Sequence, residues 1–298
     1  MKFKLLPVLL LLCVAVVYGY FQYSSKQESI IPNRNLLKEV TILTSSYDGY
    51  SELWESHYKL LFKNWPELNK ANSFIPIMLI SNELTYNDPR VVSLKIGEDT
   101  TWSNNLLKAL SSVKTKYVFL LLDDYIINSP VNESRFIELL TLLEKTNGAY
   151  IEVAKDEGMF VYGMEKHKKL VPGIEGVIYR SKNSSYRNSL QACIWNTEEL
   201  KKLIDTKESA WDFEIIGNNR TKKNPKPFYM IIDNPVVEYL NAVAKRVYEQ
   251  DVVDYINSQG IQFKPTKLPV KTKQEILDYL KTEEANKLTT PYGGNNNE

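Results

Sequence analysis

Two adjacent carboxylates, Asp123 and Asp124, directly follow the apolar run 117–122 (YVFLLL). A short apolar run of this kind is typical of a buried strand, so both acids are expected at the end of that strand. Adjacent carboxylates repel each other, and a divalent cation is the usual means of neutralising them. Mg²⁺ or Mn²⁺ is held by one or two carboxylates together with substrate phosphates. The alternative is a solvated acidic turn or a helix cap, and the apolar residues before the pair favour the metal site.

A second stretch, Ser209–Glu214 (SAWDFE), combines an aromatic residue with two acids. Trp211 offers a flat apolar face on which a sugar ring can stack, and Asp212 and Glu214 offer carboxylates. The alternative is an ordinary helix start, with Ser209 as the cap and acids in the first turn. Both interpretations can hold together, because a capped helix is a rigid support.

The elements that position these residues alternate between strands and helices. In the first half, strands are expected at 40–44, 75–80, 91–96 and 117–122, and helices at 51–64, 102–113 (with Ser103 as a cap) and 136–145. This alternation predicts an α/β fold with a mostly parallel sheet and helices on both sides. Ligands bind outside the carboxyl ends of such strands, which indicates the turn after the first strand and the residues after Leu122.

After residue 146 the pattern is looser. Short strands are expected at 149–154, 160–163, 176–180, 190–195, 228–232 and 236–240, helices at 198–204, 211–216 and 274–285, and a disordered tail at 292–298.

The N-terminus carries two lysines in residues 1–4 and then no charge until Lys26. The apolar, aromatic-ended segment 5–23 predicts a transmembrane signal-anchor with a cytoplasmic N-terminus, a type II arrangement. The alternative is a cleaved signal peptide, which would give a secreted or periplasmic protein, although the small residues of a cleavage site are missing. Residues 1–4 would then be a cytoplasmic tail, 24–38 a stem, 39–270 the main domain, and 271–298 a C-terminal helix and tail.

Composition excludes some classes of function. The 298-residue chain has a net charge of +1 and no concentrated basic run, so non-specific nucleic-acid binding is not expected. The cysteines, Cys13 and Cys193, provide neither a disulfide framework nor a metal-thiolate spacing.

From Glu39 to Gln250 the chain resembles the GT-A class of glycosyltransferases, in which a strand of the nucleotide-binding half ends in a DxD-like acidic motif. Asp123 and Asp124 occupy the place of that motif, but they are adjacent rather than spaced. Which acid ligates the metal is therefore open, and Asp124 is favoured. The resemblance implies a GT-A-like mixed, mostly parallel sheet flanked by helices, with a nucleotide-sugar half at 39–146 and an acceptor half at 147–270.

The resemblance also implies roles for individual residues. Tyr47 would stack on the nucleotide base, and Asp48 would bond the base or the ribose. The other implied donor contacts are Asp99, Trp102, Asn105 and Lys108, the departing diphosphate would meet Lys245 and Arg246, and the acceptor would meet Trp211, Gln191 and Trp195. Asp212 is the first choice for the general base that deprotonates the acceptor hydroxyl, and Glu214 the second. For Lys108, Lys245 and Arg246 the alternative is a surface charge, and for Gln191 and Trp195 a core or edge position.

The function expected from the resemblance is transfer of a sugar from a nucleoside-diphosphate sugar (UDP- or GDP-linked) to a glycan, lipid or protein acceptor. The reaction would depend on Mn²⁺ or Mg²⁺ and would be inverting, with a carboxylate base. The alternative is a catalytically inactive, membrane-tethered carbohydrate-binding or interaction protein with the same fold. A nucleotidyltransferase or phosphotransferase ranks lower, because the sequence lacks a Gly-rich phosphate loop.

Overall fold

The computed structural model describes residues 30–70, 73–155, 168–278 and 281. Within these ranges one large sheet has the strand order β3-β2-β1-β4-β8-β6-β9-β7. Its strands are β1 (Val40–Ser45), β2 (Ile77–Ser81), β3 (Val91–Lys95), β4 (Tyr117–Leu122), β6 (Tyr150–Glu152), β7 (Val177–Tyr179), β8 (Cys193–Asn196) and β9 (Phe228–Ile231). Strands β1 to β4 are mutually parallel, whereas β8 runs antiparallel to both β4 and β6. The sheet is therefore mixed: its N-terminal half is parallel, and its C-terminal half combines the parallel pair β6–β9 with antiparallel pairs.

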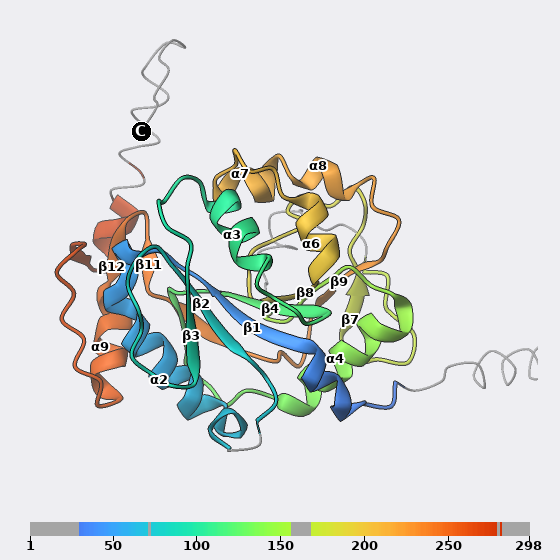
Figure 1. The fold of residues 1–298 in the computed structure, drawn as a ribbon, viewed down its shortest axis with the longest axis horizontal. Coiled ribbons are helices and arrows are strands. Elements are labelled where there is room, and N and C mark those ends of the chain that lie inside the picture. The colour runs from blue at the N-terminus through green and yellow to red at the C-terminus, as the bar shows by residue number, and fades with distance from the viewer. Residues whose placement is uncertain (1–29, 71–72, 156–167, 279–280, 282–298) are drawn as a thin grey trace, which may run out of the picture.

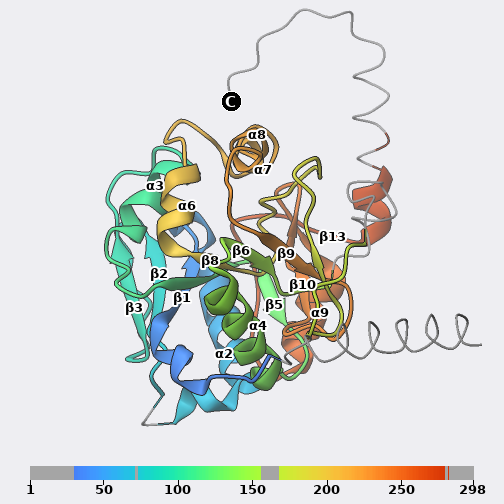
Figure 2. The same cartoon turned by 90° about the vertical axis from the view of Figure 1, so that its right-hand side faces the viewer.

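Helices cover both faces of this sheet (Figures 1 and 2). One face carries α3 (Trp102–Leu110), α6 (Thr197–Leu203) and α7 (Ala210–Ile215), and the other carries α2 (Trp54–Asn64) and α4 (Glu133–Thr146). Each face has its own apolar core, and the side chains of β4 alternate between the two: Phe119 and Leu121 pack toward α2 and α4, Val118 and Leu120 toward α3. A strand apolar on both faces belongs at the centre of such a sheet, where β4 lies.

Two smaller sheets stand beside the carboxyl end of β4. They consist of β10 (Tyr239–Asn241) paired with β5 (Tyr125–Ile127), and of β11 (Val243–Ala244), β12 (Val247–Glu249) and β13 (Val270–Lys271). Helix α9 (Gln250–Ser258) packs against them through a third apolar core. Only Asp123 and Asp124 separate β4 from β5, and the amide of Ala242 donates to the carbonyl of Asp124 at 2.8 Å. The acidic pair is therefore fixed between the large sheet and the smaller ones.

The strands expected at 40–44, 75–80, 91–96 and 117–122 are confirmed within one or two residues. Those expected at 149–154, 176–180 and 190–195 are present but shorter, as β6, β7 and β8, and 228–232 is present as β9. The helices expected at 136–145, 198–204 and 211–216 correspond to α4, α6 and α7, and residues 273–278 are helical at the start of the one expected at 274–285.

Other expectations are corrected. The helix expected from residue 51 begins at Trp54, after a 3-10 turn, η2 (Asp48–Leu53). The cap of α3 is Thr101, whose hydroxyl accepts from the amide of Asn104, while Ser103 is buried inside the helix. The strand expected at 236–240 is β10 (Tyr239–Asn241), displaced toward the C-terminus because it pairs with β5.

The remaining expectations fall outside the described residues. These are the N-terminal segment 5–23 with its flanking tail, the first residues of the stem (24–29), the strand at 160–163 and the tail at 292–298. Residues 30–38 of the expected stem are described: they include most of the 3-10 helix η1 (Arg34–Glu39), whose Leu36 and Leu37 are buried in the core, so this part packs against the domain. Among the residues that are described, no helix combines the length and the apolar character needed to cross a bilayer.

Candidate active site

A cleft of about 860 Å³ opens at the carboxyl ends of β1 and β4. It is bounded by the turn after β1, the N-terminal end of α3, the acidic pair, the helix α7 and the β11–β12 hairpin. Most of the residues predicted for the site line it: Tyr47, Asp99, Trp102, Asn105, Asp123, Asp124, Gln191, Trp211, Asp212, Glu214, Lys245 and Arg246. Segments about 200 residues apart in the sequence thus meet where the parallel sheet predicts a ligand site.

Asp123 forms the buried floor of the cleft. It is 4% exposed, and the hydroxyl of Ser46 donates a hydrogen bond to its carboxylate. The amide of Asp123 donates to the carbonyl of Ser45 at 3.2 Å, because the parallel register sets Ser45 beside Leu122. Burial, and next the charge of Asp124, raise the pKa of Asp123 well above its ordinary value. Removing this carboxylate from water without a cation is therefore costly.

Asp124 lies beside it with part of its surface open to the cleft. Burial raises the pKa of Asp124 from 3.8 to about 7. Two carboxylates whose charged forms are penalised suit a hard divalent cation, which would favour ionisation of both. In the part of the chain that the structure describes, no group of three or more His, Cys, Asp or Glu side chains could hold a metal. A cation at this pair would take its other ligands from phosphate oxygens and water, as Mg²⁺ commonly does.

The turn after β1 places two tyrosines at one end of the cleft. The rings of Tyr47 and Tyr50 meet edge to face at 4.9 Å, and Tyr47 is 37% exposed. The Tyr47 ring lies against Gly49 so closely that a Cβ added there would be 2.1 Å from its Cε2. Burial and the charge of Asp123 raise the pKa of Tyr47, while Arg246 opposes the rise. Tyr47 therefore lines the same cleft as a carboxylate and a guanidinium whose charges act on it in opposite directions.

The start of α3 borders the same end of the cleft. The indole of Trp102 donates to the Ser45 hydroxyl at 2.9 Å, and the Asn105 amide donates to Asp99 at 2.5 Å. These bonds hold polar side chains next to the end of β1. Asp99, Trp102 and Asn105 therefore line the cleft, and their contact with a donor stays a prediction.

The β11–β12 hairpin supplies the positive charge of the cleft. Its two-residue turn consists of Lys245 and Arg246, with φ of 51° and 62°. Such turns favour Asn-Gly, because left-handed backbone is costly for residues with a side chain. Both cations are exposed and line the cleft, and the Lys245 ammonium lies 5.6 Å from the centre of the Trp211 ring. The strained turn therefore carries charge rather than the residues that suit its geometry.

Helix α7 presents Trp211, Asp212 and Glu214 to the cleft, and the three side chains differ in exposure and in hydrogen-bond partners. Trp211 is 62% exposed. Asp212 forms a capping box with Ser209, and the hydrogen bonds from the Ser209 hydroxyl and amide lower the pKa of Asp212. Glu214 is half-buried, and its Oε1 accepts from the amide of Leu190 at 2.6 Å. The cap expected as an alternative for this stretch is present, and it occupies Asp212 rather than Glu214.

Three predicted site residues lie elsewhere. Asp48 does not line the cleft: its carboxylate accepts from the amides of residues 82–84 and so shapes the loop after β2. Lys108 is exposed on α3, with its ammonium near the carbonyl of Ile96. Trp195 has no exposed surface, because β8 is covered on both faces and its indole packs among Tyr150, Phe213 and Phe228. Lys108 is therefore a surface charge and Trp195 a core residue, which were the alternatives for these two positions.

Sequence reasoning missed further lining residues, among them Ser46, Tyr50, Tyr125, Lys207 and Asn241. Ser46 was within reach of prediction, since it follows a strand expected to run parallel to β4. Tyr125 and Asn241 belong to strands of three residues that leave no readable pattern.

Comparison with known proteins gives a likeness of fold. No family model and no curated protein matches this sequence. Among solved structures, Staphylococcus aureus TarS (residues 1–349) aligns at 10% identity over 67% of this chain and 59% of that one, with a TM-score of 0.43. A mannosyltransferase from Pyrobaculum calidifontis, solved with GDP-Man and Mn²⁺, aligns at 13% identity over 78% of this chain and 65% of that one, with a TM-score of 0.47. A cytidylyltransferase from Leptospira borgpetersenii aligns at 10% identity over 86% of this chain and 99% of that one, with a TM-score of 0.41.

The chain spans about 59% of the TarS fragment. At these identities and scores the likeness carries no further argument about this chain. It does not assign an activity, so the argument for function rests on the cleft.

Proposed function

We propose that this protein is a metal-dependent glycosyltransferase that moves a sugar from a nucleoside-diphosphate sugar to an acceptor. One observation carries the proposal: the Asp123–Asp124 pair and the Lys245–Arg246 turn line the same cleft, with Trp211 beside Lys245. Carboxylates that favour a divalent cation, next to paired cations, suit a diphosphate bound between them. An exposed indole at the same opening suits a sugar ring.

The residues of the acidic pair fit Mn²⁺ or Mg²⁺. Asp124, which is open to the cleft, would ligate the cation, and Asp123, bound to Ser46, would support it from below. When bound, the cation would supply positive charge against the donor diphosphate. Lys245 and Arg246 would stabilise the negative charge on the departing diphosphate from the other side of the cleft.

The donor nucleotide, UDP or GDP, would lie at the end of the cleft formed by Tyr47, Tyr50 and the start of α3. Its base would stack on Tyr47, with Asp99, Trp102 and Asn105 nearby. The acceptor, a glycan, lipid or protein, would enter beside Trp211 and Gln191. A carboxylate of α7 would take the proton of the acceptor hydroxyl, which gives an inverting reaction.

In this function the nucleotide-sugar half would comprise residues 39–146 and the acceptor half residues 147–270. Membrane attachment through a signal-anchor at 5–23, with the catalytic domain on the far side, rests on the apolar sequence of that segment alone.

A catalytically inactive, carbohydrate-binding protein with this fold is the second candidate. It is favoured by the adjacent rather than spaced acids and by the exposed Trp211. The two candidates differ in metal-dependent binding of a nucleotide, which only the enzyme requires.

The test is a panel of UDP- and GDP-sugars incubated with the full chain and Mn²⁺, with release of UDP or GDP as the readout. We expect release from at least one donor, loss of release in EDTA, and loss in Asp124→Ala. Release that survives both EDTA and the substitution would contradict the metal role. Binding of glycans without metal-dependent binding of any nucleotide would favour the second candidate.

A further inference from the structure

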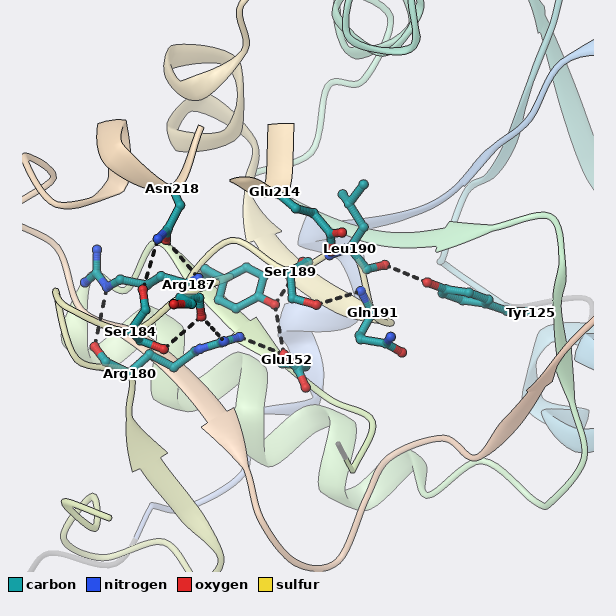
Figure 3. A network of polar contacts seen from close by, with 12 residues as sticks. Tyr125, Glu152, Arg180, Ser184, Arg187, Ser189, Leu190, Gln191, Glu214 and Asn218 are labelled. Carbon is teal, nitrogen blue, oxygen red and sulfur yellow. Dashed lines mark hydrogen bonds and ion pairs between the residues drawn. The ribbon is translucent and has the colours of Figure 1, made fainter. Parts of the chain in front are cut away.

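Leu190 is held at both of its backbone polar groups by side chains of the cleft (Figure 3). Its amide donates to Oε1 of Glu214 at 2.6 Å, and its carbonyl accepts from the hydroxyl of Tyr125 at 3.0 Å. These two groups belong to different peptide planes, so the two bonds together restrict both backbone dihedrals of Leu190. Leu190 is 3% exposed, which leaves water little access to either bond.

Tyr125 connects this point to the acidic pair. It is the residue after Asp124 and the first of β5, and its ring stacks on that of Tyr239 at 4.1 Å. The Tyr239 hydroxyl in turn donates to Oε1 of Gln191, the residue after Leu190. The position of Tyr125 is therefore fixed on one side by the chain that carries Asp124 and on the other by a stacked ring.

The loop before Leu190 is anchored to the core and to α7 by further bonds. The carbonyl of Ser189 accepts from the Tyr150 hydroxyl at 3.0 Å, and the side-chain Nδ2 of Asn188 donates to the carbonyl of Phe213 at 2.5 Å. The amide of Arg187 donates to Asn218 at 2.9 Å. Figure 3 shows Arg187 and Asn218 on the side of the loop away from Tyr125, near the fully buried ion pair of Arg180 with Glu152. These bonds fix residues 187–189, and the Tyr125 hydroxyl fixes Leu190, the residue of the loop that contacts Glu214.

Of the two carboxylates on α7, Asp212 accepts two hydrogen bonds on the same oxygen, Oδ2, one from the backbone amide of Ser209 and one from its hydroxyl. These bonds lower its pKa and tie the carboxylate to the start of its own helix. Glu214 instead accepts a hydrogen bond from the backbone amide of Leu190, in the loop that Tyr125 holds. Its orientation therefore depends on groups outside α7.

We propose that Tyr125 is a positioning residue that acts through Leu190 to orient Glu214 as the general base, coupling the base to the strand that carries the acidic pair. The inference rests on the proposed transfer. In that step the acceptor hydroxyl gives its proton to Glu214, and its oxygen forms a bond to the anomeric carbon. The bond from that carbon to the diphosphate oxygen breaks, and its electron pair leaves with the diphosphate.

The first test is Tyr125→Phe in the full chain, which removes the hydroxyl and keeps the ring stacked on Tyr239. We expect kcat to fall about tenfold, as for a misaligned proton acceptor, with the KM of the donor unchanged. Metal-dependent UDP or GDP binding stays at the wild-type value. Tyr117→Phe is the matched control: it lies at the other end of β4, and its hydroxyl bonds Glu144 at 2.7 Å. Equal loss of kcat in both variants would overturn the inference.

A double-mutant cycle separates positioning from general destabilisation. In a Glu214→Gln background, Tyr125→Phe should reduce kcat by less than about twofold, because the group it orients is gone. If the two losses multiply, Tyr125 acts independently of Glu214 and the inference is wrong.

Hydrogen exchange of the Leu190 amide, followed by NMR of leucine-labelled protein, needs no turnover. Exchange should be at least about tenfold faster in Tyr125→Phe and in Glu214→Ala, which removes the acceptor of the Leu190 amide, than in wild type or Tyr117→Phe. Unchanged exchange in Tyr125→Phe would overturn the coupling. Wild-type protein that lacks turnover with every donor would contradict the proposed function, whereas loss of the coupling alone would leave that function standing.

Discussion

The hydroxyl of Ser46 donates a hydrogen bond to Asp123 and joins the end of β1 to the end of β4 at the floor of the cleft. The same hydroxyl oxygen accepts from the Trp54 indole at 2.7 Å, which ties the bond to the first residue of α2. Asp123 is thus held by the fold, while Asp124 keeps surface in the cleft. Two adjacent acids can therefore have different roles: Asp123 supports the site from below, and Asp124 is available to a ligand in the cleft.

Asp124→Asn should stabilise the metal-free protein, and increasingly so as pH rises. Because the pKa of Asp124 is raised to about 7 in the fold, the folded state binds its proton more tightly than the unfolded state does. Stability is therefore lost as pH rises from about 4 through 7. The variant should gain roughly 1–3 kcal/mol at pH 8, less than the full shift implies because Asp124 is partly exposed, and little near pH 4. Urea unfolding in EDTA at both pH values measures this, and an equal gain at both would refute it.

Gly49→Ala should weaken nucleotide binding by displacing the Tyr47 ring. The added Cβ would lie 2.1 Å from Cε2 of that ring, and the backbone of Gly49 is not left-handed, so the side chain must move. Loss of one aromatic contact predicts an affinity reduced by about three- to tenfold for UDP or GDP, measured by calorimetry. In a Tyr47→Ala background the same substitution should have no further effect. A full additional loss there would show that Gly49 acts in another way.

Trp211→Ala should raise the KM of the acceptor about tenfold and change the stability little, because the indole is 62% exposed. Ile215→Ala is the matched control, since it is 53% exposed on the same helix but does not line the cleft. Steady-state kinetics with varied acceptor measures both. The same rise in both variants would contradict a sugar contact at Trp211.

Replacing the hairpin turn by Lys245→Asn with Arg246→Gly should make the protein more stable and less active. Asn-Gly suits the left-handed geometry that both residues now adopt, which predicts a gain of roughly 1–2 kcal/mol. Loss of both charges should weaken UDP binding more than UMP binding, because the diphosphate loses its cations. The double substitution to Gln removes the charges and keeps the strained turn, so it should show the affinity loss without the gain in stability. Equal stability of the two variants would contradict the strain argument.

The parallel half of the fold was predictable because its strands are buried on both faces. The runs at β1, β2 and β4 are continuous and apolar, and their alternation with helices predicts where their carboxyl ends meet. That reasoning predicts that the turn after β1 and the acidic pair lie at one edge of the sheet, whereas the place of Asn105 followed from the resemblance to GT-A glycosyltransferases. The smaller sheets could not be predicted from the sequence pattern. Strands β11 and β13 have two residues each, and the Lys245–Arg246 turn lacks the Asn-Gly signal of a hairpin.

The individual roles were less predictable, since they depend on burial and on distant partners. Trp195 and Trp211 both have polar neighbours in the sequence. Trp195 is nevertheless fully buried within β8, whereas Trp211 is 62% exposed. Asp212 preceded Glu214 as a candidate base. Its place three residues after Ser209 already matched a capping box, whereas the contact of Glu214 with Leu190 depends on a loop 24 residues away.

The central claim is that the Asp123–Asp124 pair binds a divalent cation together with a nucleotide diphosphate. Calorimetric titration of UDP and GDP into the full chain, with Mn²⁺ and with EDTA, tests it most directly. Asp251→Asn, at an exposed acid of α9 outside the cleft, is the control for Asp124→Asn. We expect binding of at least one nucleotide that needs Mn²⁺, is weakened at least about tenfold in Asp124→Asn, and is unchanged in Asp251→Asn. Binding that is equally tight in EDTA, or unaffected by Asp124→Asn, would contradict it.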